Sequence, residues 1–209
     1  MNSEYSYDII LMKFQEVKLK LKELLIKNRS YRRFYQEEKV DIQDLKEMIS
    51  NVRFIPSAAN LQPLEFILVN NEIKNKSIFK NLKWAGYIED WDGPEQGERP
   101  SSYIVVLGNR EISSYIDWDF GIALQTILLS AVEMGYGGCT IASFNKDNIR
   151  NLFNIPENYD ILPIIAIGKP KEKVVIEEIK DNDIKYWRDE DQVHHVPKRS
   201  LNDLIFISG

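Results

Sequence analysis

The longest apolar helix in this sequence sets the strongest limit on its fold. Residues 115–134 carry apolar side chains around most of a helical circumference, whereas a surface helix carries a single apolar stripe. A helix of this kind has to be buried on several sides. We therefore expect it at the centre of a domain or at a subunit interface. The apolar positions are Ile122, Leu124, Ile127, Leu128, Leu129, Ala131 and Val132.

Short apolar runs predict buried strands, and helical segments separate them. The strands are predicted at residues 66–69, 103–107 and 161–167. Helical spacing is found at residues 17–27, at 41–52 with Asp41 as N-cap, at 72–83 and at 147–153. This alternation predicts an α+β or α/β class with helices on the faces of the sheet. No repeat or linker divides the 209 residues, so we expect a single domain over residues 1–209.

Composition and residue supply exclude several classes of function. A net charge of -5 argues against a general nucleic-acid binder. No apolar run approaches the roughly 20 residues of a membrane span, and residues 1–4 do not resemble a secretory leader, so we expect a cytoplasmic protein. The single Cys139 excludes an internal disulfide and is more typical of packing than of a nucleophile. The adjacent His194 and His195 lack metal-ligand spacing, so no metal site is expected.

A compact group of arginines follows the first predicted helix. Residues 29–34 include Arg29, Arg32 and Arg33, with Ser30 between them. Guanidinium groups match phosphate oxygens with paired hydrogen bonds, and the serine adds a neutral donor. The segment therefore predicts an anion site, and the alternative is a solvated basic turn.

The stretch from Arg53 to Val69 combines small residues with two carboxamides. Asn60 and Gln62 lie between Pro56 and Pro63, and each offers a donor and an acceptor. Small neighbours would let a flat ligand approach the backbone, and the carboxamides suit the polar edge of a heteroaromatic ring. The alternative is an ordinary helix-to-strand loop.

Two further segments allow either a structural or a functional reading. The glycines of residues 135–138 permit a helix C-cap at Gly135 and close backbone approach to a ligand, or simply a turn into a strand. Residues 84–100 contain Trp84, Tyr87 and Trp91 with several glycines and prolines. Such a segment is typical of a lid that stacks on a substrate, or of a cover over a core edge.

Four segments, taken in order, resemble the FMN-dependent nitroreductase family. They are residues 29–34, residues 56–63, residues 135–139 after the helix around 119–125, and residues 197–201. Residues 84–100 and 186–189 look like a poorly assigned branch of that family. The resemblance implies a three-layer α+β fold, with a central, mainly antiparallel sheet flanked by helices. It also implies a homodimer that exchanges terminal segments and binds FMN at the subunit interface.

The resemblance also implies roles for individual residues. Arg29, Ser30 and Arg32 would hold the phosphate and ribityl chain, and Lys198 and Arg199 would close on the phosphate. Asn28 departs from the family, because many members have an arginine there. The ring would lie along Pro56, Ser57, Ala58 and Asn60, with Asn60 and Gln62 at its polar edge. The backbone of Ile141, Ala142 and Ser143 would face the hydride-accepting atom of the ring, where an N–H dipole stabilises negative charge.

The activity implied is transfer of hydride from NAD(P)H to FMN, then reduction of a small electron-poor acceptor, nitroaromatic or quinone-like, by a ping-pong mechanism. The cofactor carries the chemistry, so no catalytic side chain is expected. Two alternatives stay open. One is a flavin-dependent dehydrogenase or dehalogenase on the same scaffold. The other is a non-catalytic flavin-binding or interaction protein.

Overall fold

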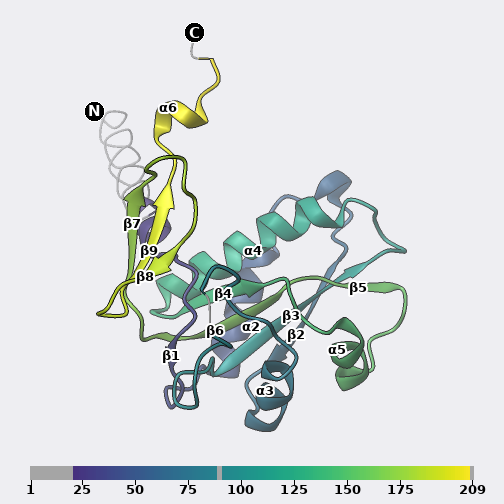
Figure 1. Ribbon diagram of the computed structural model, residues 1–209. Helices are drawn as coiled ribbons and strands as arrows, with labels where there is room; N and C mark the ends of the chain where they lie inside the picture. Colours follow the sequence, from purple (N-terminus) through teal and green to yellow (C-terminus); the bar gives the residue numbers. More distant parts are fainter. Residues whose placement is uncertain (1–20, 89–90, 208–209) are drawn as a thin grey trace, which may run out of the picture.

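A six-stranded antiparallel sheet forms the centre of the molecule (Figure 1). The computed structural model describes residues 21–88 and 91–207. The strands run in the order β1-β6-β3-β2, with β4 paired to β6 and β5 paired to β3. Every pairing in this sheet is antiparallel, which confirms the predicted α+β class. The bounds are β1 Phe34–Tyr35, β2 Leu64–Val69, β3 Ser102–Asn109, β4 Gly137–Ile141, β5 Tyr159–Ile161 and β6 Ile164–Pro170.

Strand β3 is buried along its whole length because helices cover both faces of the sheet. Side chains alternate between the faces of a strand. Accordingly Tyr103 and Val105 belong to one apolar cluster, and Ile104 and Val106 to the other. Helices α3 (Glu72–Phe79) and α5 (Lys146–Phe153) contribute to the first cluster, and α2 (Ile42–Val52) and α4 (Ile116–Glu133) to the second. The fold is therefore three-layered, as expected.

The helices agree with their predicted positions to within a few residues. Asp41 caps α2 by accepting from the backbone N–H of Gln43 at 2.7 Å, as predicted. Helix α4 begins and ends one residue inside the predicted 115–134, and Gly135 follows it with φ +81°. Helix α3 ends at Phe79, four residues before the predicted end. The helix predicted at 17–27 falls partly outside the described residues, and residues 21–27 are helical.

The single strand predicted at 161–167 is wrong in its details. The chain instead forms β5 and β6, with Leu162 and Pro163 between them. Proline has no N–H to give to a ladder, so the pairing with β3 is interrupted there. The N–H of Leu162 still donates to the carbonyl of Val106 at 2.9 Å, which holds the two strands in one sheet.

The C-terminal region forms a second, smaller sheet that the sequence analysis did not predict. Strands β7 (Val174–Glu178), β9 (His194–Lys198) and β8 (Trp187–Arg188) lie in that order, and α6 (Leu201–Leu204) follows. Figure 1 shows this tail sheet to one side of the main sheet. In the part of the chain that the structure describes, no helix is both long enough and apolar enough to cross a membrane.

The tail sheet is expected to be most stable in mildly acidic solution because of His195. Its Nδ1 lies 2.5 Å from Glu177 and its Nε2 3.1 Å from Asp189. These carboxylates, Asp189 foremost, raise the pKa of His195, and the bond to His195 lowers the pKa of Asp189. The stabilisation that His195 gives to the folded state is complete below the pKa of about 6.5 that histidine has in the unfolded chain. It is lost as the pH rises through the higher pKa of His195 in the folded chain. The stabilisation that Asp189 gives is present above the pKa of about 3.9 that aspartate has in the unfolded chain. It is lost as the pH falls through the lower pKa of Asp189 in the folded chain.

Replacing His195 by glutamine should therefore lower the free energy of unfolding most between about pH 4 and pH 6.5. Urea unfolding of both proteins over a pH series measures the difference. A difference that does not shrink toward alkaline pH would contradict this interpretation.

Candidate functional site

Two cavities contain residues that the sequence analysis singled out. The basic cavity, of about 330 Å³, is lined by Asn28, Arg29, Ser30, Arg32, Gln125, Leu128, Tyr186, His194, Val196 and Lys198. The apolar cavity, of about 250 Å³, is lined by Ile49, Val52, Arg53, Ile55, Ser57, Gln62, Leu64, Phe66 and Asp119. The two sets share no residue.

The basic cavity brings together cations from the two ends of the chain. Arg29 and Arg32 follow the first helix, whereas Lys198 is the last residue of β9. Arg199, which was expected beside Lys198, does not line the cavity, and its guanidinium donates to the carbonyl of Asp203. Three cations around one cavity make it a suitable place for a phosphate dianion.

Strand β4 holds the arginine segment in place through its glycines. Ser30 forms a bridge with Gly138, and the N–H of Tyr31 donates to the carbonyl of Gly138 at 3.0 Å. A Cβ on Gly137 would lie 2.5 Å from the Tyr31 ring, and one on Gly138 would lie 2.8 Å from the carbonyl oxygen of Ala166. These two glycines therefore allow close approach of neighbouring chain segments.

The two arginines of the basic cavity are only partly satisfied within the chain. Arg29 donates from Nη2 to the carbonyl of Leu25 at 2.7 Å, but its buried Nε has no partner in the described residues. Arg32 donates from Nη1 to the carbonyl of Ser30 at 3.2 Å. Arg33, by contrast, forms two hydrogen bonds with Glu98 at 2.6 and 2.7 Å, which hold the pKa of Glu98 at about 2. A bound anion would satisfy the orphaned Arg29 donor.

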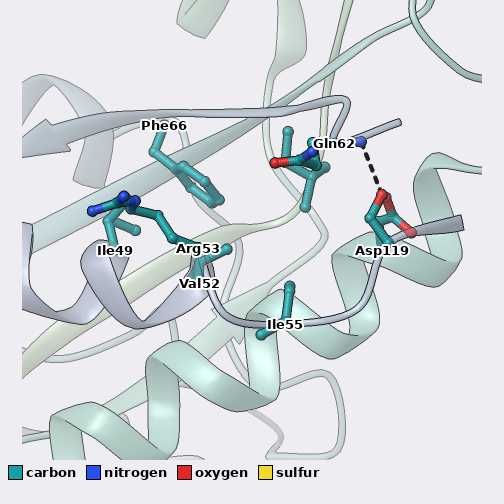
Figure 2. Close-up of a pocket in the computed structure, with 9 residues that line it drawn as sticks. Ile49, Val52, Arg53, Ile55, Gln62, Phe66 and Asp119 are labelled. Carbon is teal, nitrogen blue, oxygen red and sulfur yellow. Dashed lines mark hydrogen bonds between the residues drawn. The ribbon is translucent and has the colours of Figure 1, made fainter. Parts of the chain in front are cut away.

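The loop at one side of the apolar cavity is organised by Asp119 of α4 (Figure 2). This carboxylate is 3% exposed and accepts from the Ser57 hydroxyl and, at 3.0 Å, from the N–H of Ala58. The N–H of Gln62 donates to the Ser57 oxygen at 2.9 Å. Asn60 is exposed, and its backbone and side-chain oxygens accept from Gln62 Nε2 at 3.1 and 3.3 Å. Pro56, Ala58 and Asn60 do not line the cavity.

This loop is strained, so it depends on its anchor. Ala59, Asn60 and Gln62 have φ of 49°, 57° and 52°, values that side-chain-bearing residues rarely adopt. We expect Asp119→Ala to lower the free energy of unfolding by about 2–4 kcal/mol, because it removes two hydrogen bonds to a buried charge. Asp117→Ala, an exposed carboxylate on the same helix, is the control and should change little. Equal urea midpoints for the two variants would show that Asp119 does not anchor the loop.

The other predicted site residues lie outside both cavities. Ile141 ends β4 in the core, and Ala142 and Ser143 are exposed after it. The predicted substrate aromatics differ in their surroundings. Trp84 is buried and packs against Phe79 and Trp91, while Trp91 also lies under Arg188 at 4.3 Å. Tyr87 is half exposed and contacts Tyr186 at 5.0 Å between ring centres.

Several lining residues were not predicted from the sequence. Asp119 gave no distinct signal, because Asp117 is a second acidic residue in the same turn of the helix. His194 and Tyr186 gave none, since their place depends on the fold of the tail sheet. Cys139 is buried in the core, and burial raises its pKa to about 11, which agrees with a packing role.

An antiparallel sheet between helical layers, with a cationic cavity beside β4, defines a fold with a candidate anion-binding site. Comparison with known proteins gives the family of this fold. The sequence model of the Nitroreductase family matches residues 26–169, so the chain belongs to the nitroreductase family. It is accordingly an oxidoreductase of that family.

Individual relatives extend the comparison. A protein of Archaeoglobus fulgidus, provisionally named an NADH dehydrogenase/NAD(P)H nitroreductase, is 26% identical over 71% of this chain and 85% of its own. The solved structure of a nitroreductase family protein from Streptococcus pneumoniae has a TM-score of 0.65 at 18% identity, covering 77% of this chain and 95% of that one. An FMN-dependent nitroreductase from Clostridium difficile has a TM-score of 0.59 at 24% identity, covering 80% and 92%.

Proposed function

We propose that this protein binds FMN and transfers electrons from NAD(P)H to a small electron-poor acceptor, nitroaromatic or quinone-like, in a ping-pong reaction. The observation that carries the proposal is the basic cavity, where Arg29, Arg32 and Lys198 surround one space and Arg29 Nε has no partner in the described residues. FMN would supply the hydride chemistry. The residues of this chain would bind, orient and shield it.

In this proposal Arg29, Arg32 and Lys198 bind the phosphate with charge-assisted hydrogen bonds, and Ser30 adds a hydroxyl. Arg199 would join them when the tail adjusts around the ligand. The loop containing Pro56, Ser57, Ala58, Asn60 and Gln62 would lie along the ring, and the backbone at Ile141, Ala142 and Ser143 would face its reactive edge. Of the three aromatic residues proposed to meet an acceptor, Tyr87 is the most exposed, whereas Trp84 is buried and Trp91 is partly buried.

We further propose that the site is completed by a second copy of the chain. Asp119 contacts the apolar cavity and Gln125 the basic cavity. Six residues of helix correspond to about 9 Å of rise and about 1.7 turns, so these side chains lie on different faces of α4. The loop of residues 56–62 is anchored on the face of α4 that carries Asp119, and the basic cavity lies at the other face. In a dimer, the same loop of the second copy would approach the basic cavity directly.

The apolar end of the chain supports a dimer with exchanged segments. Leu204, Ile205, Phe206 and Ile207 are 45–97% exposed in the single chain. Removing residues 204–209 should convert a dimer into monomers, because this apolar surface would lose its burial in the partner. Sedimentation of the full and shortened chains measures this. A shortened chain that stays dimeric, or a full chain that is monomeric, would contradict segment exchange through this end.

Anaerobic addition of NADH or NADPH to the FMN-loaded protein tests the proposed activity. We expect bleaching of the flavin absorbance, then reoxidation by added quinone or nitroaromatic. Absence of bleaching at high nicotinamide would favour the non-catalytic flavin binder. Halogenated phenols belong in the acceptor screen, because an iodotyrosine deiodinase of Thermotoga neapolitana is 22% identical over 72% of this chain.

A further inference from the structure

A buried histidine lies at the wall of the basic cavity and contacts one of its arginines. His194 of β9 is 1% exposed, and its Nε2 is 3.3 Å from Arg32 Nη1. Arginine only donates, so Nε2 has to be the acceptor and the ring has to be neutral, with its proton on Nδ1. Burial, followed by the charges of Arg32, Arg188 and His195, lowers the pKa of His194 to about 4, which agrees with a neutral ring.

The same arginine is held from two other directions. The carboxylate of Glu172 accepts from the backbone N–H of Arg32 and, at 3.1 Å, from Nη2 of Arg188. The Tyr186 ring lies 4.7 Å from the Arg32 guanidinium carbon and 5.1 Å from the His194 ring. Glu172 therefore fixes the Arg32 backbone, while His194 and Tyr186 confine its side chain.

We propose that His194 is a positioning residue for the anion site, where it holds the Arg32 guanidinium in one arrangement before an anionic ligand enters. An arginine side chain loses conformational entropy when it binds, and a prior hydrogen bond removes part of that cost. His194 Nδ1 is buried without a partner in the described residues, so the contact of Nε2 with Arg32 Nη1 is the hydrogen bond that the ring makes in that part of the chain. The inference rests on the proposed function only in taking FMN as the anion.

Substitutions of His194 that place a polar atom at different distances from the backbone test this role. Glutamine can place an acceptor near the position of histidine Nε2, whereas asparagine reaches only the Nδ1 position and leucine offers neither. FMN affinity, measured by quenching of flavin fluorescence, should fall about tenfold in His194→Leu and His194→Asn and less than about threefold in His194→Gln. His195→Gln is the matched neighbour, does not line the cavity, and should leave FMN affinity unchanged. Equal affinity in the Gln and Asn variants would overturn the proposal.

A double-mutant cycle separates positioning from general damage. If His194 acts through Arg32, then His194→Leu should weaken FMN binding little further in an Arg32→Ala background. A full additional loss there would overturn the proposal. Inorganic phosphate serves as a second probe through its effect on thermal unfolding. A wild-type protein that is stabilised by phosphate but does not bind FMN would contradict the proposed function, and His194 would still be tested by the phosphate response of its variants.

Discussion

Replacing Arg29 and Arg32 together by alanine is expected to weaken FMN binding between about a hundredfold and ten-thousandfold. Each arginine would lose a charge-assisted contact worth about 1.5–3 kcal/mol, and about 1.4 kcal/mol corresponds to tenfold in affinity. Both side chains line the basic cavity, and neither forms an ion pair with another residue of 21–88 or 91–207. Titration of the apoprotein with FMN, followed by fluorescence, measures the loss.

Arg199→Ala provides the comparison for this prediction. The sequence suggested a similar role for Arg199, but its side chain donates to the carbonyl of Asp203 and lies outside the cavity lining. We expect Arg29→Ala alone to weaken binding more than Arg199→Ala. Unchanged retention of flavin after dialysis of the Arg29 and Arg32 double variant would overturn the phosphate assignment.

Glu172→Ala is expected to cost about 3–5 kcal/mol of the free energy of unfolding, more than the cost expected for Asp119→Ala. The Glu172 side chain is fully buried and that of Arg188 is 8% exposed. Removing the carboxylate would leave the Arg188 guanidinium buried without its partner charge, and it would also free the N–H of Arg32. A domain of ordinary stability has only about 5–15 kcal/mol in total.

Urea unfolding of Glu172→Ala against Glu190→Ala, an exposed glutamate in the same tail, measures this cost. Replacing both partners, by Glu172→Leu with Arg188→Met, should recover part of the loss, since a buried pair removed whole leaves no lone charge. A loss below about 1 kcal/mol in Glu172→Ala would indicate an ion pair that solvent reaches.

The main sheet and its helices could be predicted because their signals are local. The apolar run of β3, the Asp41 cap and the bounds of α4 each follow from a few neighbouring residues. The expected burial of α4 on several sides is not seen in the single chain, where Ile122 and Trp118 are exposed. The tail sheet could not be predicted, because its strands β7 and β9 are partly exposed and their apolar residues do not alternate regularly. Their pairing joins distant positions, such as Val174 with His194.

The site residues also differ in whether their roles follow from neighbouring positions or from contacts between distant ones. Arg29, Ser30 and Arg32 could be predicted as one anion-binding group because they are adjacent in sequence, and their meeting with Lys198 followed from the family resemblance. The anchoring role of Asp119 could not be predicted, because its partners Ser57 and Ala58 lie some sixty positions earlier. For the same reason, the contact between His194 and Arg32 could not be predicted from the sequence.

The absorption spectrum of the purified protein, before and after incubation with FMN and removal of excess ligand, tests the central claim most directly. Retained flavin bands, with the released cofactor identified as FMN by mass, are the predicted result, because cations from both ends of the chain line one cavity. A colourless protein that does not retain FMN supplied at micromolar concentration would contradict it.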